Sequence, residues 1–157
     1  TNHAYFNLSK EESILNHQLK IESDQFLQSD DYFLPTGRVL DVDNYPGFDF
    51  RDFRKIGENM QCKNEKIIGY NHYFIGKNNK KELNKIATLR CKDQGLNLEV
   101  HTTMPGIMIY TGDYHSFASI SMEAHHYPDF PNKLAFPQNI FIDDVYRKEF
   151  IIYRVIY

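Results

Sequence analysis

The sequence predicts an all-β protein, a sandwich or barrel of antiparallel strands. Strand-like segments recur at short intervals with turn-forming residues between them, and no helix of ordinary length interrupts the pattern. The aromatic residues are 11 Tyr and 12 Phe with no Trp, a mixture that favours strands. With 157 residues, of which 41% are hydrophobic, the chain is long enough to form one packed domain.

Alternation of apolar and polar side chains predicts the strands of the first half: residues 2–8, 15–22, 38–42 and 67–75. In the first of these, Ala4, Phe6 and Leu8 share one face, and His3 and Tyr5 share the other. Turn-forming residues separate the strands.

Residues 52–59 are expected to form one or two helical turns. The Asn- and Lys-rich residues 77–81 are expected to form a loop tip.

The second half contains the clearest hairpin, residues 86–91 and 96–104 joined by a turn at 92–95. Further strands are expected at residues 107–111, 120–125 and 148–157.

The strand at 120–125 presents a carboxylate in an alternating pattern. Its apolar face carries Ile120, Met122 and Ala124, whereas Ser121, Glu123 and His125 share the other face. Taken alone, this pattern is typical of a solvated strand face. A glutamate on a rigid strand is, however, also well placed for acid–base chemistry.

Charge and composition argue against several classes of function. A net charge of −3 and a pI near 6.1 give no reason to expect nucleic-acid binding or attraction to a membrane surface. No apolar run approaches the ~20 residues of a membrane span. Cys62 and Cys91 are too few for a disulfide framework, so we expect a reducing compartment, the cytoplasm.

Two other chemistries are disfavoured. Glu123, His125, His126 and Asp129 form the densest group of candidate metal ligands, but adjacent strand residues point to opposite faces and no further ligand follows at a recognisable spacing. Ser121 lies close to histidines, but the sequence has no G-x-S-x-G motif of a nucleophilic serine.

Several blocks, taken in order, resemble the aldose 1-epimerase (galactose mutarotase) family. They are TNHAYFNL (1–8), LPTG (34–37), FDFR (48–51) with Ile56-Gly57, GYNHYF (69–74), PGIMIYTG (105–112), and MEAHHYPD (122–129) with Asn132 and Phe136-Pro137. The resemblance implies a large antiparallel β-sandwich with a sugar cleft on one sheet. It also implies that residues 1–157 are the C-terminal part of a single domain, whose N-terminal portion is an expected partner.

The resemblance further implies a reaction, the interconversion of the α and β anomers of a free aldohexose such as galactose or glucose. A base removes the proton of the anomeric hydroxyl while an acid protonates the ring oxygen, and no metal or redox cofactor is needed. By motif position Glu123 is similar to the base and His3 to the acid. Two groups that flank one sugar are expected roughly 5–8 Å apart, given hydrogen-bond reach on each side.

The sequence departs from the family at two positions that resemble sugar contacts. Asn71 stands where the family usually has Asp, and Met108 where it usually has Gln. An amide lacks the strength of a charge-assisted hydrogen bond, and a thioether cannot replace the hydrogen bonds of an amide. Three hypotheses therefore stand: an active epimerase, a sugar-binding or regulatory protein on the same fold, and a structural module in which Glu123 is merely solvated.

Overall fold

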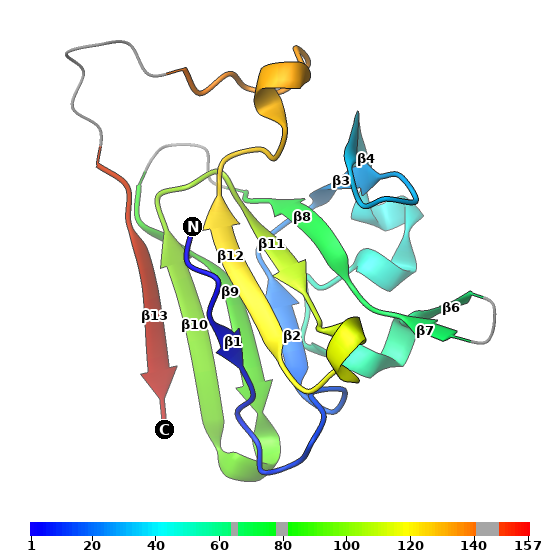
Figure 1. Ribbon diagram of the computed structural model, residues 1–157. Coiled ribbons are helices and arrows are strands. Elements are labelled where there is room, and N and C mark those ends of the chain that lie inside the picture. The colour runs from blue at the N-terminus through cyan, green and yellow to red at the C-terminus, as the bar shows by residue number, and fades with distance from the viewer. Residues whose placement is uncertain (64–65, 78–81, 141–147) are drawn as a thin grey trace.

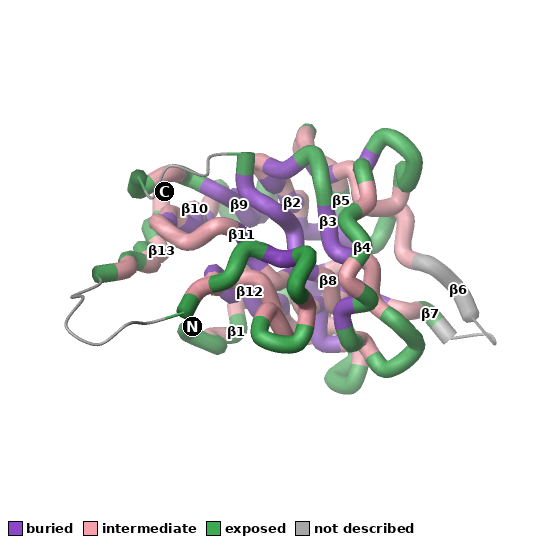
Figure 2. Tube along the Cα trace, turned by 90° about the horizontal axis from the view of Figure 1, so that it is seen from above, coloured by how far each residue is buried: buried purple, intermediate pink, exposed green. Residues whose placement is uncertain are grey.

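Two antiparallel sheets lie face to face, as predicted for an all-β sandwich (Figure 1). The computed structural model describes residues 1–63, 66–77, 82–140 and 148–157. Most of the predicted loop tip at 77–81 therefore lies outside the described residues. Buried residues follow the strands, whereas exposed residues follow the loops at the rim (Figure 2).

The first sheet has six strands. In order across the sheet they are β1 (Tyr5–Phe6), β12 (Ile120–His125), β11 (Gly106–Tyr110), β8 (Asn71–Ile75), β3 (Gln25–Ser29) and β4 (Pro35–Asp41). The short β1 is an edge strand that lies along β12 (Figure 1). Every neighbouring pair in this sheet is antiparallel.

The second sheet has five strands, in the order β13 (Ile151–Ile156), β10 (Leu96–Thr102), β9 (Asn84–Cys91), β2 (Gln18–Ile21) and β5 (Arg54–Lys55). A separate hairpin pairs β6 (Gln61–Lys63) with β7 (Lys66–Ile68). The helices of the described residues are single 3₁₀ turns: η1 (Val42–Asn44), η2 (Pro46–Phe48), η3 (Ile56–Asn59), η4 (Lys92–Gln94), η5 (Asp113–His115) and η6 (Phe130–Asn132).

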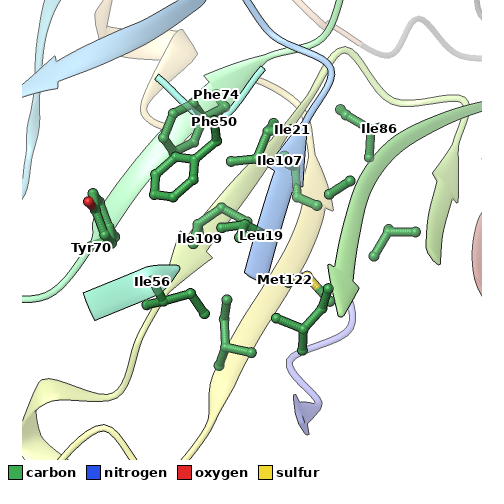
Figure 3. Close-up of a cluster of buried hydrophobic side chains, with 14 of the residues drawn as sticks. Leu19, Ile21, Phe50, Ile56, Tyr70, Phe74, Ile86, Ile107, Ile109 and Met122 are labelled. Carbon is green, nitrogen blue, oxygen red and sulfur yellow. The ribbon is translucent and has the colours of Figure 1, made fainter. Parts of the chain in front are cut away.

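The core lies between the two sheets (Figure 3). The six-stranded sheet contributes alternate residues of β11 and β12, and the five-stranded sheet contributes residues such as Leu19 and Ile21, all buried. The Tyr153 hydroxyl of β13 donates a hydrogen bond of 2.8 Å to the Met122 carbonyl of β12, which ties the sheets together at one side. Because each strand alternates, the remaining side chains of β11 and β12, among them Met108, Ser121 and Glu123, lie on the opposite face of the six-stranded sheet.

The structure confirms the strand at 120–125, which coincides with β12, and the hairpin at 86–104, which is β9 and β10 joined through η4. The continuous strand predicted for 67–75 is wrong, because it breaks at Gly69 and Tyr70 between β7 and β8. Here the backbone packs against Thr111, so that a β-carbon on Gly69 would overlap the Thr111 hydroxyl. The Tyr70 amide donates to that hydroxyl at 2.8 Å.

Two other expectations need revision. The helical turns expected at 52–59 are in part the strand β5, and the 3₁₀ turn η3 accounts for the rest. Strand β3 was not predicted at all, because its sequence QFLQS does not alternate. Among the described residues, no helix has the length and apolar character needed to cross a membrane.

His72 lies on the core side of β8, opposite Ile109 of β11. Its ring packs edge-on against Phe48, with ring centroids 4.7 Å apart. The backbone N–H of Asn71 donates a hydrogen bond of 3.1 Å to Nδ1 of His72. Burial lowers the pKa of His72 from 6.5 to about 4. The side chain is therefore neutral in the folded protein at neutral pH.

This burial predicts an acid-sensitive fold. Between pH 6.5 and about 4 the unfolded chain binds a proton at His72 that the folded chain does not bind, so the free energy of unfolding falls as the pH is lowered through that window. The loss amounts to up to about 3 kcal/mol. Urea unfolding at several pH values should show this slope and a shallower one for His72→Phe.

His115→Phe, at an exposed position in η5, is the matched control and should keep the slope of the wild type. An unchanged slope in His72→Phe would show that another group is responsible.

Candidate active site

The outer face of the six-stranded sheet carries the candidate residues in cross-strand rows. One row runs from Tyr73 of β8 through Met108 of β11 to Glu123 of β12. Because directly opposed residues of antiparallel strands point to the same face, these side chains are neighbours. The sheet register thus brings together side chains that are up to 50 positions apart in the sequence.

A second row lies one step further along the same strands. It contains Asn71 of β8, Tyr110 of β11, Ser121 of β12 and Tyr5 of β1. His3 precedes Tyr5 by two residues and so lies on the same face, beside the first row. The outer face therefore brings the start of the chain to the strand that carries Glu123.

His3 and Glu123 are in direct contact. The Nε2 atom of His3 lies 3.3 Å from Oε1 of Glu123. The Glu123 side chain is 11% exposed and the His3 side chain is 53% exposed, so the carboxylate is fixed in the sheet whereas the imidazole stands at its open edge. The pair combines a proton acceptor and a proton donor, which is the minimum that general acid–base catalysis requires.

Two neighbours hold the His3 ring. The Ser121 hydroxyl lies 3.2 Å from Nδ1, the nitrogen that does not face Glu123. The Tyr5 ring lies against the imidazole at a centroid distance of 4.9 Å, and the Tyr110 ring meets that of Tyr5 edge-on at 6.3 Å. The imidazole is thus positioned by a hydroxyl on one side and an aromatic ring on the other.

An apolar cluster covers the outer face on the other side of Glu123. The segment after β12 places Phe136 in one buried cluster with Leu27, Tyr73 and Ile75, and Met108 packs against this cluster. The Tyr73 hydroxyl donates a hydrogen bond of 2.8 Å to the His125 carbonyl. Burial raises the pKa of Tyr73 well above its ordinary value, so that this phenol stays a neutral donor.

His125 lies at the end of β12 with its ring 5.1 Å from that of Tyr73. Burial lowers the pKa of His125, an effect that a 2.5 Å hydrogen bond from Nδ1 to the His126 carbonyl partly offsets. Among the described residues, no group of three or more His, Cys, Asp and Glu side chains is arranged to hold a metal ion.

All four residues singled out from the sequence lie on this one face. His3 and Glu123 meet, closer than the roughly 5–8 Å expected for groups that already flank a sugar. Met108 stands directly opposite Glu123, whereas Asn71 lies on β8, two strands away from β12. The alternative of a solvated strand residue does not describe Glu123, because its side chain is mostly buried.

The roles of Ser121 and Tyr73 in the site were not predicted from the sequence. Ser121 was placed on the face of Glu123 and weighed as a nucleophile, and Tyr73 entered only as part of the GYNHYF block. The available signal was the alternation itself, which places Ser121 on the same face as Glu123. It gave no reason to pair Ser121 with His3, which is 118 positions away in the chain.

Fold and site together define a class: an antiparallel β-sandwich that carries a carboxylate–imidazole pair on the outer face of one sheet. Comparison with known proteins makes the class specific. The aldose 1-epimerase family profile matches residues 1–153, which is nearly the whole chain. The chain belongs to the aldose 1-epimerase family, as the resemblance indicated.

Individual relatives agree. The chain is 33% identical to the galactose mutarotase of Bos taurus over 152 residues, which cover 87% of this chain and 43% of that protein. It is 31% identical to the aldose 1-epimerase of Escherichia coli (strain K12) over 155 residues, 88% of this chain and 44% of that one. The chain thus spans less than half the length of these relatives.

Solved structures show the same fold. An aldose epimerase homologue from C. elegans superposes with a TM-score of 0.85 at 25% identity, covering 98% of this chain and 50% of that one. A galactose 1-epimerase from Lactobacillus acidophilus superposes with a TM-score of 0.63 at 26% identity, covering 79% of this chain and 39% of that one.

The site geometry predicts a steric requirement at Gly106. This residue pairs with His125 and Ile75, and a β-carbon there would overlap the Tyr73 phenol ring. We expect Gly106→Ala to displace Tyr73 and to lower the free energy of unfolding by about 1–3 kcal/mol. Chemical denaturation measures the change.

Gly47→Ala is the matched control, because the nearest atom to a β-carbon there is an ordinary 3.5 Å away. Equal stability of both variants and the wild type would contradict the packing described for Tyr73.

Proposed function

We propose that this protein is an aldose 1-epimerase, which interconverts the α and β anomers of a free aldohexose such as galactose or glucose. The observation that carries the proposal is the contact between His3 and Glu123 on the outer sheet face. Membership of the aldose 1-epimerase family supports it independently. The chemistry follows from the two side chains.

The reaction begins with Glu123 ionised and His3 protonated. Glu123 takes the proton of the anomeric hydroxyl, the electron pair forms the carbonyl at C1, the C1–O5 bond breaks, and His3 delivers its Nε2 proton to O5. The open aldehyde then rotates about its C1–C2 bond. Closure on the other face reverses these transfers: His3 takes back the proton of the O5 hydroxyl as O5 attacks C1, and Glu123 gives its proton to O1, so that atoms and charges balance over the cycle.

The 3.3 Å contact is too short to hold a sugar between the two groups. The sugar must therefore separate them, and the imidazole is the group that can move. Its side chain is half exposed and belongs to the segment before the edge strand β1, whereas Glu123 lies inside the sheet. We infer that the ring of His3 turns when the anomeric centre enters beside Glu123, so that Nε2 moves away from Glu123 while Nδ1 stays beside the Ser121 hydroxyl.

Asn71 and Met108 are the proposed substrate contacts on the same face. The Asn71 side chain can both donate and accept hydrogen bonds to sugar hydroxyls. Met108 offers only apolar contact beside Glu123 and packs into the cluster around Tyr73.

The alternative is a sugar-binding or regulatory protein with little or no turnover. One observation favours it: Met108, the nearest cross-strand neighbour of Glu123, is committed to an apolar cluster and supplies no hydrogen bond. Each buried sugar hydroxyl left without a partner weakens binding by roughly 1–3 kcal/mol. The alternative predicts saturable sugar binding without faster anomer exchange.

The relatives are more than twice as long as the matched region, so the assay requires protein that carries the complete domain. We propose that its N-terminal portion completes the site, and that a monosaccharide binds there as the substrate. We also propose a cytoplasmic location, which the buried free thiol of Cys91 supports.

The central prediction concerns Glu123 and His3. In polarimetry of freshly dissolved α-galactose and α-glucose, the wild type should accelerate relaxation to equilibrium. Glu123→Gln and His3→Gln should each reduce kcat by roughly 10²–10⁴-fold, because each removes one of the two proton-transfer groups.

Glu99→Gln on the outer face of the other sheet controls for loss of a carboxylate elsewhere and should retain full activity. Relaxation at the buffer rate with the folded wild type would rule out the epimerase proposal, and sugar binding detected by calorimetry would then favour the alternative.

The substrate role of Asn71 predicts a gain of affinity. Asn71→Asp replaces a neutral acceptor by a charged one, and charge-assisted hydrogen bonds are about twice as strong, so KM for the hexose should fall several-fold, roughly five-fold. Initial rates over a range of sugar concentrations measure this. Asn44→Asp in η1 adds the same charge away from the site and should leave KM unchanged; an equal KM in Asn71→Asp would remove Asn71 from the site.

A further inference from the structure

The geometry points to Ser121 as a positioning residue that sets the tautomer and orientation of the His3 imidazole. No part of the proposed reaction so far uses Ser121. The inference rests on the proposed epimerase function, because it explains how His3 presents the correct nitrogen to the sugar. It is, however, testable by a spectroscopic measurement that needs no turnover.

The position of Ser121 is fixed by its pairing within the sheet. It lies on β12 two residues before Glu123 and pairs with Tyr5 of β1 and Tyr110 of β11. The residue is 0% exposed, and its hydroxyl lies 3.2 Å from Nδ1 of His3. A buried hydroxyl with strands on both sides is a fixed reference point for a ring that is itself half exposed.

The two ring nitrogens of His3 have different partners. Nδ1 faces the Ser121 hydroxyl, whereas Nε2 faces the Glu123 carboxylate. In the imidazolium form both nitrogens carry protons, and the serine oxygen can accept from Nδ1. Nε2 is then the nitrogen whose proton is directed towards the place where the sugar reacts.

The contact matters most after that proton has gone to the ring oxygen. Neutral imidazole has two tautomers, and the hydrogen bond made by one nitrogen decides which of them is populated. A hydrogen bond from Nδ1–H to Ser121 leaves the lone pair on Nε2, ready to take the proton back when the sugar closes. Without Ser121 the ring is free to rotate and to place its proton on either nitrogen.

The geometry does not make Ser121 a nucleophile. A nucleophilic serine must reach the substrate, and this side chain is fully buried beneath the ring of His3. Its partner nitrogen is Nδ1, on the side of the ring away from Glu123. The serine therefore acts through His3 and not on the sugar.

The direct test uses Ser121→Ala, with Ser121→Thr as the variant that retains the hydroxyl. ¹⁵N NMR of the imidazoles reports the tautomer, and the His3 signals are identified among the seven histidines by their absence in His3→Gln. The Glu123 carboxylate at Nε2 favours the Nε2–H form in the resting protein, so the tautomer is measured in the Glu123→Gln background, whose amide can donate to Nε2 as a protonated Glu123 does. At a pH where His3 is neutral, that background with Ser121 intact or with Ser121→Thr should show the Nδ1–H form. Ser121→Ala should shift His3 towards a mixture of the two forms.

The same variants have a kinetic signature. Ser121→Ala should lower kcat about ten-fold with little change in KM, a fraction of the roughly 10²–10⁴-fold that a positioned general acid contributes. The loss should vanish in the His3→Gln background, because there is no ring left to position. Ser119→Ala, a serine just before β12, is the matched control and should retain wild-type kcat.

The outcomes separate the two proposals. No acceleration by the wild type defeats the epimerase function, while the NMR shift still decides whether Ser121 sets the His3 tautomer. An active wild type with an unchanged His3 tautomer and unchanged kcat in Ser121→Ala overturns the inference. A loss of kcat that persists equally in the His3→Gln background also overturns it, because Ser121 would then act on something other than His3.

Discussion

The register between β1 and β12 is the constraint on which the candidate site depends. Tyr5 stands opposite Ser121, and this pairing brings His3 within reach of Glu123. Because strand side chains alternate, a slip of one residue would turn His3 into the core and break the pair. β1 is short, so contacts outside the ladder must hold it: the Asn7 side chain donates to the Ala118 carbonyl at 2.9 Å.

The two side chains of the acid–base pair also differ in how firmly the surrounding structure holds them. Glu123 sits in a strand whose other face is anchored in the core by Met122 and Ala124, whereas His3 lies at the sheet edge. A rigid base and a more mobile acid suit a reaction in which the sugar must first separate them. Behind β1, buried His17 accepts a hydrogen bond from the Leu8 amide at 3.0 Å, and burial lowers the pKa of His17, which keeps it neutral for that role.

Much of the fold was predictable because it is encoded locally. Alternation located β12 and assigned Glu123 to its outer face, and turn residues located the β9–β10 hairpin. The break at Gly69 and the strand β3 were not predictable, since the first depends on packing against Thr111 and the second on neighbours within the sheet. The contact between His3 and Glu123 is long-range, so only the family resemblance suggested the pair, and nothing local suggested the part of Ser121.

The most direct test of the account is a structure of the protein with a bound aldohexose. The account predicts the sugar on the outer face of the six-stranded sheet, with O1 and O5 each about 2.6–3.2 Å from the Glu123 carboxylate and His3 Nε2, respectively. It also predicts that these two side chains have moved apart from their 3.3 Å contact. A sugar bound elsewhere, with His3 and Glu123 still in contact, would contradict it.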